Sequence, residues 1–155
     1  MTNNDILRRI RYALDISDPA MIAIFKLYDH EIDQAGLVGL LKKEDEEDHI
    51  ACSDAVMALF LDGLILYRRG GEKIVRDAAG NPDSPLTNND ILKKIRIALE
   101  LKEDDMLRIL QLADIRVSKS ELSALFRKKG HKNYRECGDQ FLRNFLNGLT
   151  KDHRG

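Results

Sequence analysis

Apolar residues recur every three or four positions along most of the chain, a spacing that predicts amphipathic helices rather than strands. The first predicted helix runs from about Asn4 to Asp15, with Asn3 or Asn4 as its N-cap. The residues of its apolar stripe are Ile6, Leu7, Ile10, Ala13 and Leu14. A second helix is predicted from Asp18, where an Asp-Pro pair is typical of a cap followed by proline, to about Tyr28.

Two further helices complete the first half of the chain. Asp33 is suited to cap a third helix, and Ser53 to begin a fourth helix that ends near Gly70. Gly63 lies inside the fourth helix, where glycine costs up to about 1 kcal/mol relative to alanine. Because Gly148 occupies the equivalent place in the second half, we predict a close helix–helix contact at both glycines. The alternative is a pair of glycines with no structural role.

The pattern is duplicated along the chain. Residues 2–14 read TNNDILRRIRYAL and residues 87–99 read TNNDILKKIRIAL. Adding 85 to each number from 2 to 70 aligns the two halves without a gap, with 25 identities in 69 positions. Such a fixed offset is typical of a repeated structural unit. We therefore predict an all-α fold with two homologous four-helix repeats related by pseudo-two-fold symmetry.

The repeats occupy residues 1–70 and 87–155, and residues 71–86 join them. The joining segment, GEKIVRDAAGNPDSPL, is rich in Gly, Pro, Asp and Ser and has no periodicity, which predicts a flexible linker. The second repeat repeats the helix plan, and its residues Ser118 to Glu121 form a capping box for the third helix.

The composition favours a water-soluble protein. Apolar residues make up 43% of the chain, enough for a core, and charged residues 33%. No apolar run approaches the roughly 18 residues that would span a bilayer. The first residues, MTNNDILRR, have no secretory apolar core, so we expect a cytoplasmic location.

The Cys and His residues give little support for a catalytic or metal site. Cys52 and Cys137 precede the fourth helix of their repeats, where a thiol can have a lowered pKa. Burial in equivalent small gaps is the favoured interpretation, and a thiol enzyme using Cys137 or a disulfide between the two cysteines is a lesser alternative. The His and Cys spacings lack the paired pattern of a zinc site. We predict no catalytic residue, no metal and no cofactor.

The two repeats carry opposite charge. Residues 1–70 have eight Lys and Arg against 13 Asp and Glu, a net charge of −5, and residues 87–155 have 15 against 10, a net charge of +5. The difference is concentrated in one pair of equivalent loops. The acidic loop, a predicted partner-facing surface, consists of Glu44, Asp45, Glu46, Glu47 and Asp48. Charge of this kind influences the choice of partner rather than the fold.

The equivalent region of the second repeat is basic. Cations interleaved with an aromatic residue can hold phosphates and stack on a base. The predicted phosphate or partner contacts are Arg127, Lys128, Lys129, His131, Lys132, Tyr134 and Arg135. The preceding segment, residues 112–128, resembles a bacterial helix-turn-helix, although Arg116 stands where that family prefers glycine and the turn is one residue short.

These features favour a non-enzymatic binding or adaptor module that recognises a protein partner. The alternative is a helix-turn-helix-like regulator that binds nucleic acid through the basic second repeat. A third interpretation concerns the loops alone: the acidic and basic loops could face each other across the pseudo-two-fold axis, or join two molecules head to tail. A membrane partner is not expected.

Several stretches carry a family resemblance that covers both repeats. They are TNNDIL followed by IR-x-AL in each repeat, LLKKEDEED from Leu40, FLDGL from Phe60, and HKNYRECGDQFLRNFLNGL from His131. On these residues the chain resembles the YehS-like proteins, a bacterial family of small cytoplasmic proteins with no established activity. The resemblance implies a duplicated bacterial domain without a cofactor.

Overall fold

The structure is a computed structural model that describes residues 1–71 and 85–154. These residues form eight α-helices and no strand, which confirms the all-α prediction. The helices are α1 (Asn3–Leu14), α2 (Asp18–Lys26), α3 (Gln34–Leu41), α4 (Asp54–Arg69), α5 (Asn88–Leu99), α6 (Glu103–Leu112), α7 (Lys119–Ala124) and α8 (Asp139–Arg154). The predicted linker lies mostly outside the described residues.

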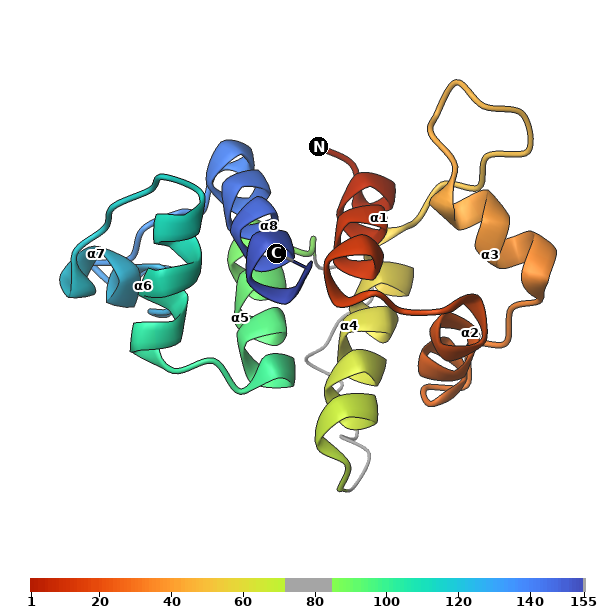
Figure 1. Cartoon of the computed structure of the whole chain (residues 1–155), viewed down its shortest axis with the longest axis horizontal. Coiled ribbons are helices and arrows are strands. Elements are labelled where there is room, and N and C mark those ends of the chain that lie inside the picture. Colours follow the sequence, from red (N-terminus) through yellow and green to blue (C-terminus); the bar gives the residue numbers. More distant parts are fainter. Residues whose placement is uncertain (72–84, 155) are drawn as a thin grey trace.

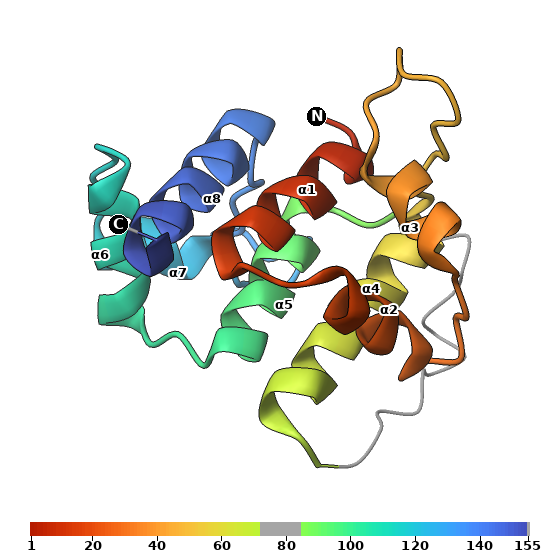
Figure 2. The ribbon, with the colours of Figure 1, turned by 45° about the vertical axis from the view of Figure 1, so that its right-hand side comes forward.

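The two repeats meet along a central layer built from the first and last helix of each. Helix α1 packs against α8, and α4 packs against α5, so each repeat pairs its first helix with the last helix of the other (Figure 1). Helices α2 and α3 lie at one end of this layer, and α6 and α7 lie at the other (Figure 2). This exchange of equivalent contacts is the arrangement expected for a pseudo-two-fold pair.

Polar contacts across the central layer occur in equivalent pairs. Arg69 pairs with Glu100 at 3.3 Å, and at the equivalent positions Arg154 pairs with Asp15 at 3.2 Å. The start of each repeat is held in the same way. The Leu86 backbone N–H donates to Asp54 at 3.0 Å, and the Met1 amino group pairs with Asp139 at 3.2 Å.

Each repeat encloses apolar residues from all of its helices. Phe25 and Phe60 pack with ring centroids 5.2 Å apart in the first repeat, and Phe145 is fully buried in the second. The contact at the helix glycines is confirmed. A Cβ added to Gly63 or Gly148 would come closer than 3.0 Å to a backbone oxygen of the neighbouring helix. Glycine is therefore required for the close approach of α2 to α4 and of α6 to α8.

The caps agree with the sequence in part. Asp33, Ser53 and Ser118 cap their helices as predicted. The predicted caps of the first two helices lie one or two residues after the observed caps. Thr2 caps α1 through a capping box with Asp5, and Ser17 caps α2. Several neighbouring residues could serve as caps in both places, so local preference alone did not distinguish them.

Candidate interaction surfaces

A buried asparagine closes the base of the acidic loop. The Asn4 side-chain nitrogen donates to the backbone carbonyls of Leu40 and Ile50, each at 2.8 Å. Its side-chain oxygen accepts from the Cys52 backbone N–H at 3.0 Å. Asn4 is 4% exposed, so these backbone groups have little access to water as an alternative partner. The acidic loop, residues 44–48, therefore projects from a fixed base.

The second repeat holds its basic loop in the same way. Asn89 donates to the carbonyls of Leu125 and Arg135, each at 2.9 Å, and accepts from the Cys137 N–H at 2.9 Å. The second asparagine of the TNND stretch is thus a loop clamp in both repeats. The local sequence predicts only a helix cap at this position, because the loop groups that the asparagine binds lie 36 to 48 residues away.

The acidic loop is exposed along its length. All five of its carboxylate residues are exposed, and only Glu46 bends back, accepting from the Lys43 N–H at 3.0 Å. Two large apolar residues flank it along the chain and are themselves exposed, Val38 at 40% and Ile50 at 46%. The equivalent residues of the second repeat are Ser123 and Arg135. The acidic loop with Val38 and Ile50 is called the acidic end below.

The predicted basic contacts are also mostly exposed. Arg127, Lys128, Lys129 and Lys132 form no ion pair with another described residue. Arg135 pairs with Glu121 at 3.3 Å, and the His131 ring accepts from the Asn133 N–H at 3.1 Å. Tyr134 is half-buried, which covers part of the ring that would stack on a base. The segment from Arg127 to Arg135 is called the basic end below.

The two loops lie at opposite ends of the long axis of the molecule (Figure 1). The central layer of α1, α4, α5 and α8 separates them. The alternative in which the loops face each other within one chain is therefore wrong. The reason is that the first and last helices of both repeats meet at the axis, which places the connections between the third and fourth helices on the outside in both directions.

The resemblance to a helix-turn-helix does not extend to the geometry. Six residues, from Ala113 to Ser118, separate α6 from α7, whereas a helix-turn-helix joins its helices by a turn of about three or four residues. The candidate recognition helix α7 is only six residues long. Helices α6 and α7 therefore do not form a helix-turn-helix with a DNA-recognition helix. The exposed cations lie instead on the loop that follows α7.

The cysteines are unsuited to nucleophilic chemistry. Both thiols are free and buried, Cys52 at 6% and Cys137 at 2% exposure. Burial, assisted by Asp54, raises the pKa of Cys52 to about 12. Burial and Asp139 raise the pKa of Cys137 to about 11. The lowered pKa that a thiol enzyme requires is therefore contradicted, and the interpretation as core residues is supported.

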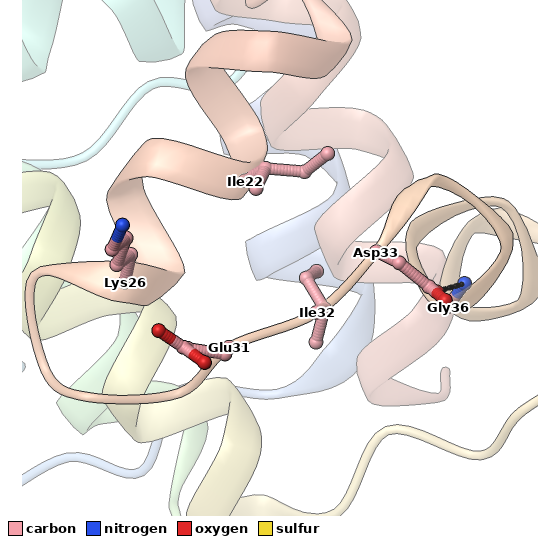
Figure 3. Close-up of a pocket in the computed structure, with 6 residues that line it drawn as sticks. All are labelled: Ile22, Lys26, Glu31, Ile32, Asp33 and Gly36. Carbon is pink, nitrogen blue, oxygen red and sulfur yellow. Dashed lines mark hydrogen bonds between the residues drawn. The ribbon is translucent and has the colours of Figure 1, made fainter.

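A shallow hollow lies between α2 and α3 of the first repeat. Ile22 and Ile32 supply its apolar lining, while Lys26 and Glu31 lie at the side nearest the end of α2 (Figure 3). Asp33, which also lines the hollow, accepts from the Gly36 N–H at 2.7 Å and so serves the N-terminus of α3. The hollow thus adds apolar surface to the same half of the molecule as the acidic end.

No helix in residues 1–71 or 85–154 is both long and apolar enough to cross a membrane. Within the same residues, His, Cys, Asp and Glu side chains form no cluster of three that could hold a metal ion.

Comparison with known proteins identifies the family. The model of the family described as a protein of unknown function (DUF1456) matches residues 3–70 and again residues 88–155. The chain is 45% identical over 150 residues to the uncharacterized protein YehS of Escherichia coli (strain K12), covering 97% of this chain and 95% of that protein. The chain therefore belongs to the DUF1456 family, as two copies of its domain. No solved structure matches the chain.

Proposed function

We propose that the protein is a non-enzymatic binding module that recognises a cytoplasmic protein partner through its acidic end. One observation carries the proposal: the exposed acidic loop is flanked along the chain by two exposed apolar residues, Val38 and Ile50. Interfaces between proteins combine an apolar centre with a polar rim, and complementary charge accelerates and orients the encounter. The partner is accordingly a protein that presents a basic surface around an apolar contact.

The difference between the repeats supports this choice of surface. The fold of the two repeats does not require an apolar residue at these positions, since Ser123 and Arg135 replace Val38 and Ile50 in the second repeat. The asparagine clamp also holds the ends of the acidic loop, which lowers the entropy lost when a partner orders the loop.

The experiment compares proteins retained from a bacterial lysate by the immobilised chain at about 150 mM salt, where exposed charges act over roughly 8 Å. Two variants alter the acidic end: the triple charge reversal E44K/E46K/E47K and the double variant V38S/I50R, which copies the second repeat. The triple variant K128A/K129A/K132A is the matched control. A specific partner lost by both acidic-end variants and kept by the control supports the proposal. Equal retention by all variants contradicts it.

The alternative function is nucleic-acid binding through the basic end. It is favoured by four exposed cations there, Arg127, Lys128, Lys129 and Lys132, without a carboxylate partner among the described residues. Anisotropy of labelled duplex DNA and RNA tests it directly. Several phosphate contacts would weaken binding by orders of magnitude between about 50 and 200 mM salt, and K128A/K129A/K132A would abolish it. Absence of binding at the lower salt would exclude this function.

A further inference from the structure

A groove follows the boundary between the repeats where α1 meets α8. Asp5, Arg8, Arg9, Tyr12 and Lys43 line it from the first repeat, and Asn147 and Thr150 line it from the second. Its volume is about 450 Å³, within the range of small-molecule sites. The groove belongs to neither the acidic end nor the basic end, and its walls come from both repeats.

The positive charge in this groove is only partly neutralised. Arg8 forms an ion pair with Asp5 and also donates to the Lys42 carbonyl at 2.9 Å. Arg9 donates instead to the neutral amide of Asn147, at 3.2 Å. Lys43 forms no ion pair with a described residue. Two of the three cations therefore lack a carboxylate partner in the groove.

The equivalent place at the other boundary, between α5 and α4, is different. There Lys94 occupies the position of Arg9 and forms an ion pair with Asp62, which is 6% exposed and occupies the position of Asn147. Ile65 occupies the position of Thr150. One boundary thus presents an ion pair and an isoleucine, whereas the other presents an amide, a hydroxyl and two cations without a carboxylate partner among the described residues.

These cations are also unusual within their repeat. The first repeat has a net charge of −5, yet it keeps a basic residue at Arg8, Arg9 and Lys43, as the second repeat does at the equivalent positions. The three groove positions are therefore basic in both repeats, although the net charges of the repeats have opposite sign. One carboxylate of the acidic loop, Glu46, accepts from the Lys43 backbone N–H at 3.0 Å.

We propose that this groove binds the phosphate group of a small phosphorylated ligand. Guanidinium and ammonium groups form charge-assisted hydrogen bonds with phosphate oxygens, and Arg9 and Lys43 supply one of each. The Tyr12 ring is 59% exposed and carries the Arg154 guanidinium 4.2 Å from its centroid. This ring provides a flat surface for the remainder of the ligand, such as a nucleobase.

Calorimetric titration of the full chain with inorganic pyrophosphate, phosphate and adenosine monophosphate tests the proposal. We expect K43A to weaken pyrophosphate binding about tenfold, the loss of one charge-assisted bond. Its matched control is K128A, which removes the equivalent lysine from the other repeat and should change nothing. A second variant, N147D, gives Arg9 the carboxylate that Lys94 already has, and it should weaken binding similarly without loss of folding. E46Q should strengthen binding.

The outcomes are distinct. If adenosine monophosphate binds more tightly than phosphate and Y12A removes the difference, the ligand is a nucleotide. If they bind equally, recognition is confined to the phosphate. Failure of pyrophosphate to bind at about 1 mM, near the weak limit of specific binding, would overturn the proposal. Equal weakening of binding by K43A and K128A would also overturn the proposal. The weakening would then come from the lower total positive charge and not from loss of a contact in the groove.

Discussion

The side-chain oxygen of Asn4 accepts a hydrogen bond from the Cys52 backbone N–H at 3.0 Å, across 48 residues of the chain. Since the Asn4 nitrogen also holds the carbonyls of Leu40 and Ile50, one side chain connects the first helix to both ends of the acidic loop. Asn89 repeats the arrangement in the second repeat. The loops that differ most in charge are therefore anchored identically.

Replacing Asn4 with alanine should lower the free energy of unfolding by about 2–4 kcal/mol, because three backbone groups around a buried side chain lose their partner. Urea denaturation measures the loss. Asn133→Ala serves as the control, since Asn133 is exposed in the basic end and should change the stability by less than about 0.5 kcal/mol. Similar values for the two variants would show that the clamp contributes little.

Alanine at Gly63 should destabilise the protein, although the same change in an open helix stabilises by up to about 1 kcal/mol. The added Cβ would overlap the Ile24 carbonyl oxygen, and overpacking of this kind costs typically about 1–3 kcal/mol. Gly36→Ala in α3 is the matched control. Its nearest contact would be an Asp33 side-chain oxygen at 3.2 Å, against 2.3 Å from the Cβ at Gly63 to the Ile24 carbonyl oxygen. Thermal unfolding compares them, and a higher Tm for Gly63→Ala would refute the close approach.

The buried thiols should resist alkylation in the native protein. At neutral pH both Cys52 and Cys137 are protonated and covered, so iodoacetamide should modify them only as fast as the chain opens. Mass spectrometry after timed labelling, with a urea-unfolded sample for comparison, measures this rate. Rapid labelling of Cys137 in the folded protein would restore the thiol-enzyme interpretation.

The raised pKa values also predict how stability changes with pH. The Cys52 pKa is about 12 in the folded chain against an ordinary value of 9.0, so the unfolded chain loses its proton first as pH rises. The folded state binds more protons in this interval, and the free energy of unfolding should therefore fall between pH 9.0 and about 12. Urea unfolding at pH 7.5 and 10 should show a smaller decrease for Cys52→Ala than for the unaltered chain.

The sequence predicted the repeated helices because the evidence for them is local and occurs twice. Apolar spacing, the Ser118 cap and the pair Gly63 and Gly148 all act within a few residues or recur at a fixed offset. The role of Asn4 was missed because the groups it binds are distant in sequence, and a nearby Thr2 satisfies the helix end instead.

The groove at the boundary was missed for a related reason. It depends on α1 packing against α8 of the other repeat, which no single repeat specifies. The substitution that distinguishes the two boundaries, Asn147 for Asp62, is visible in the aligned repeats. Its meaning emerges only when the partners Arg9 and Lys94 are known. The charge pattern correctly predicted that the acidic and basic loops are exposed. Their relative position could be known only from the packing of the helices.

The most direct test of the proposed function is hydrogen–deuterium exchange on the chain with and without its retained partner at moderate salt. The account predicts slower exchange in α3 and the acidic loop, from Val38 to Ile50, with no change between Arg127 and Arg135. Protection confined to the basic end would contradict recognition through the acidic end and would favour the alternative function.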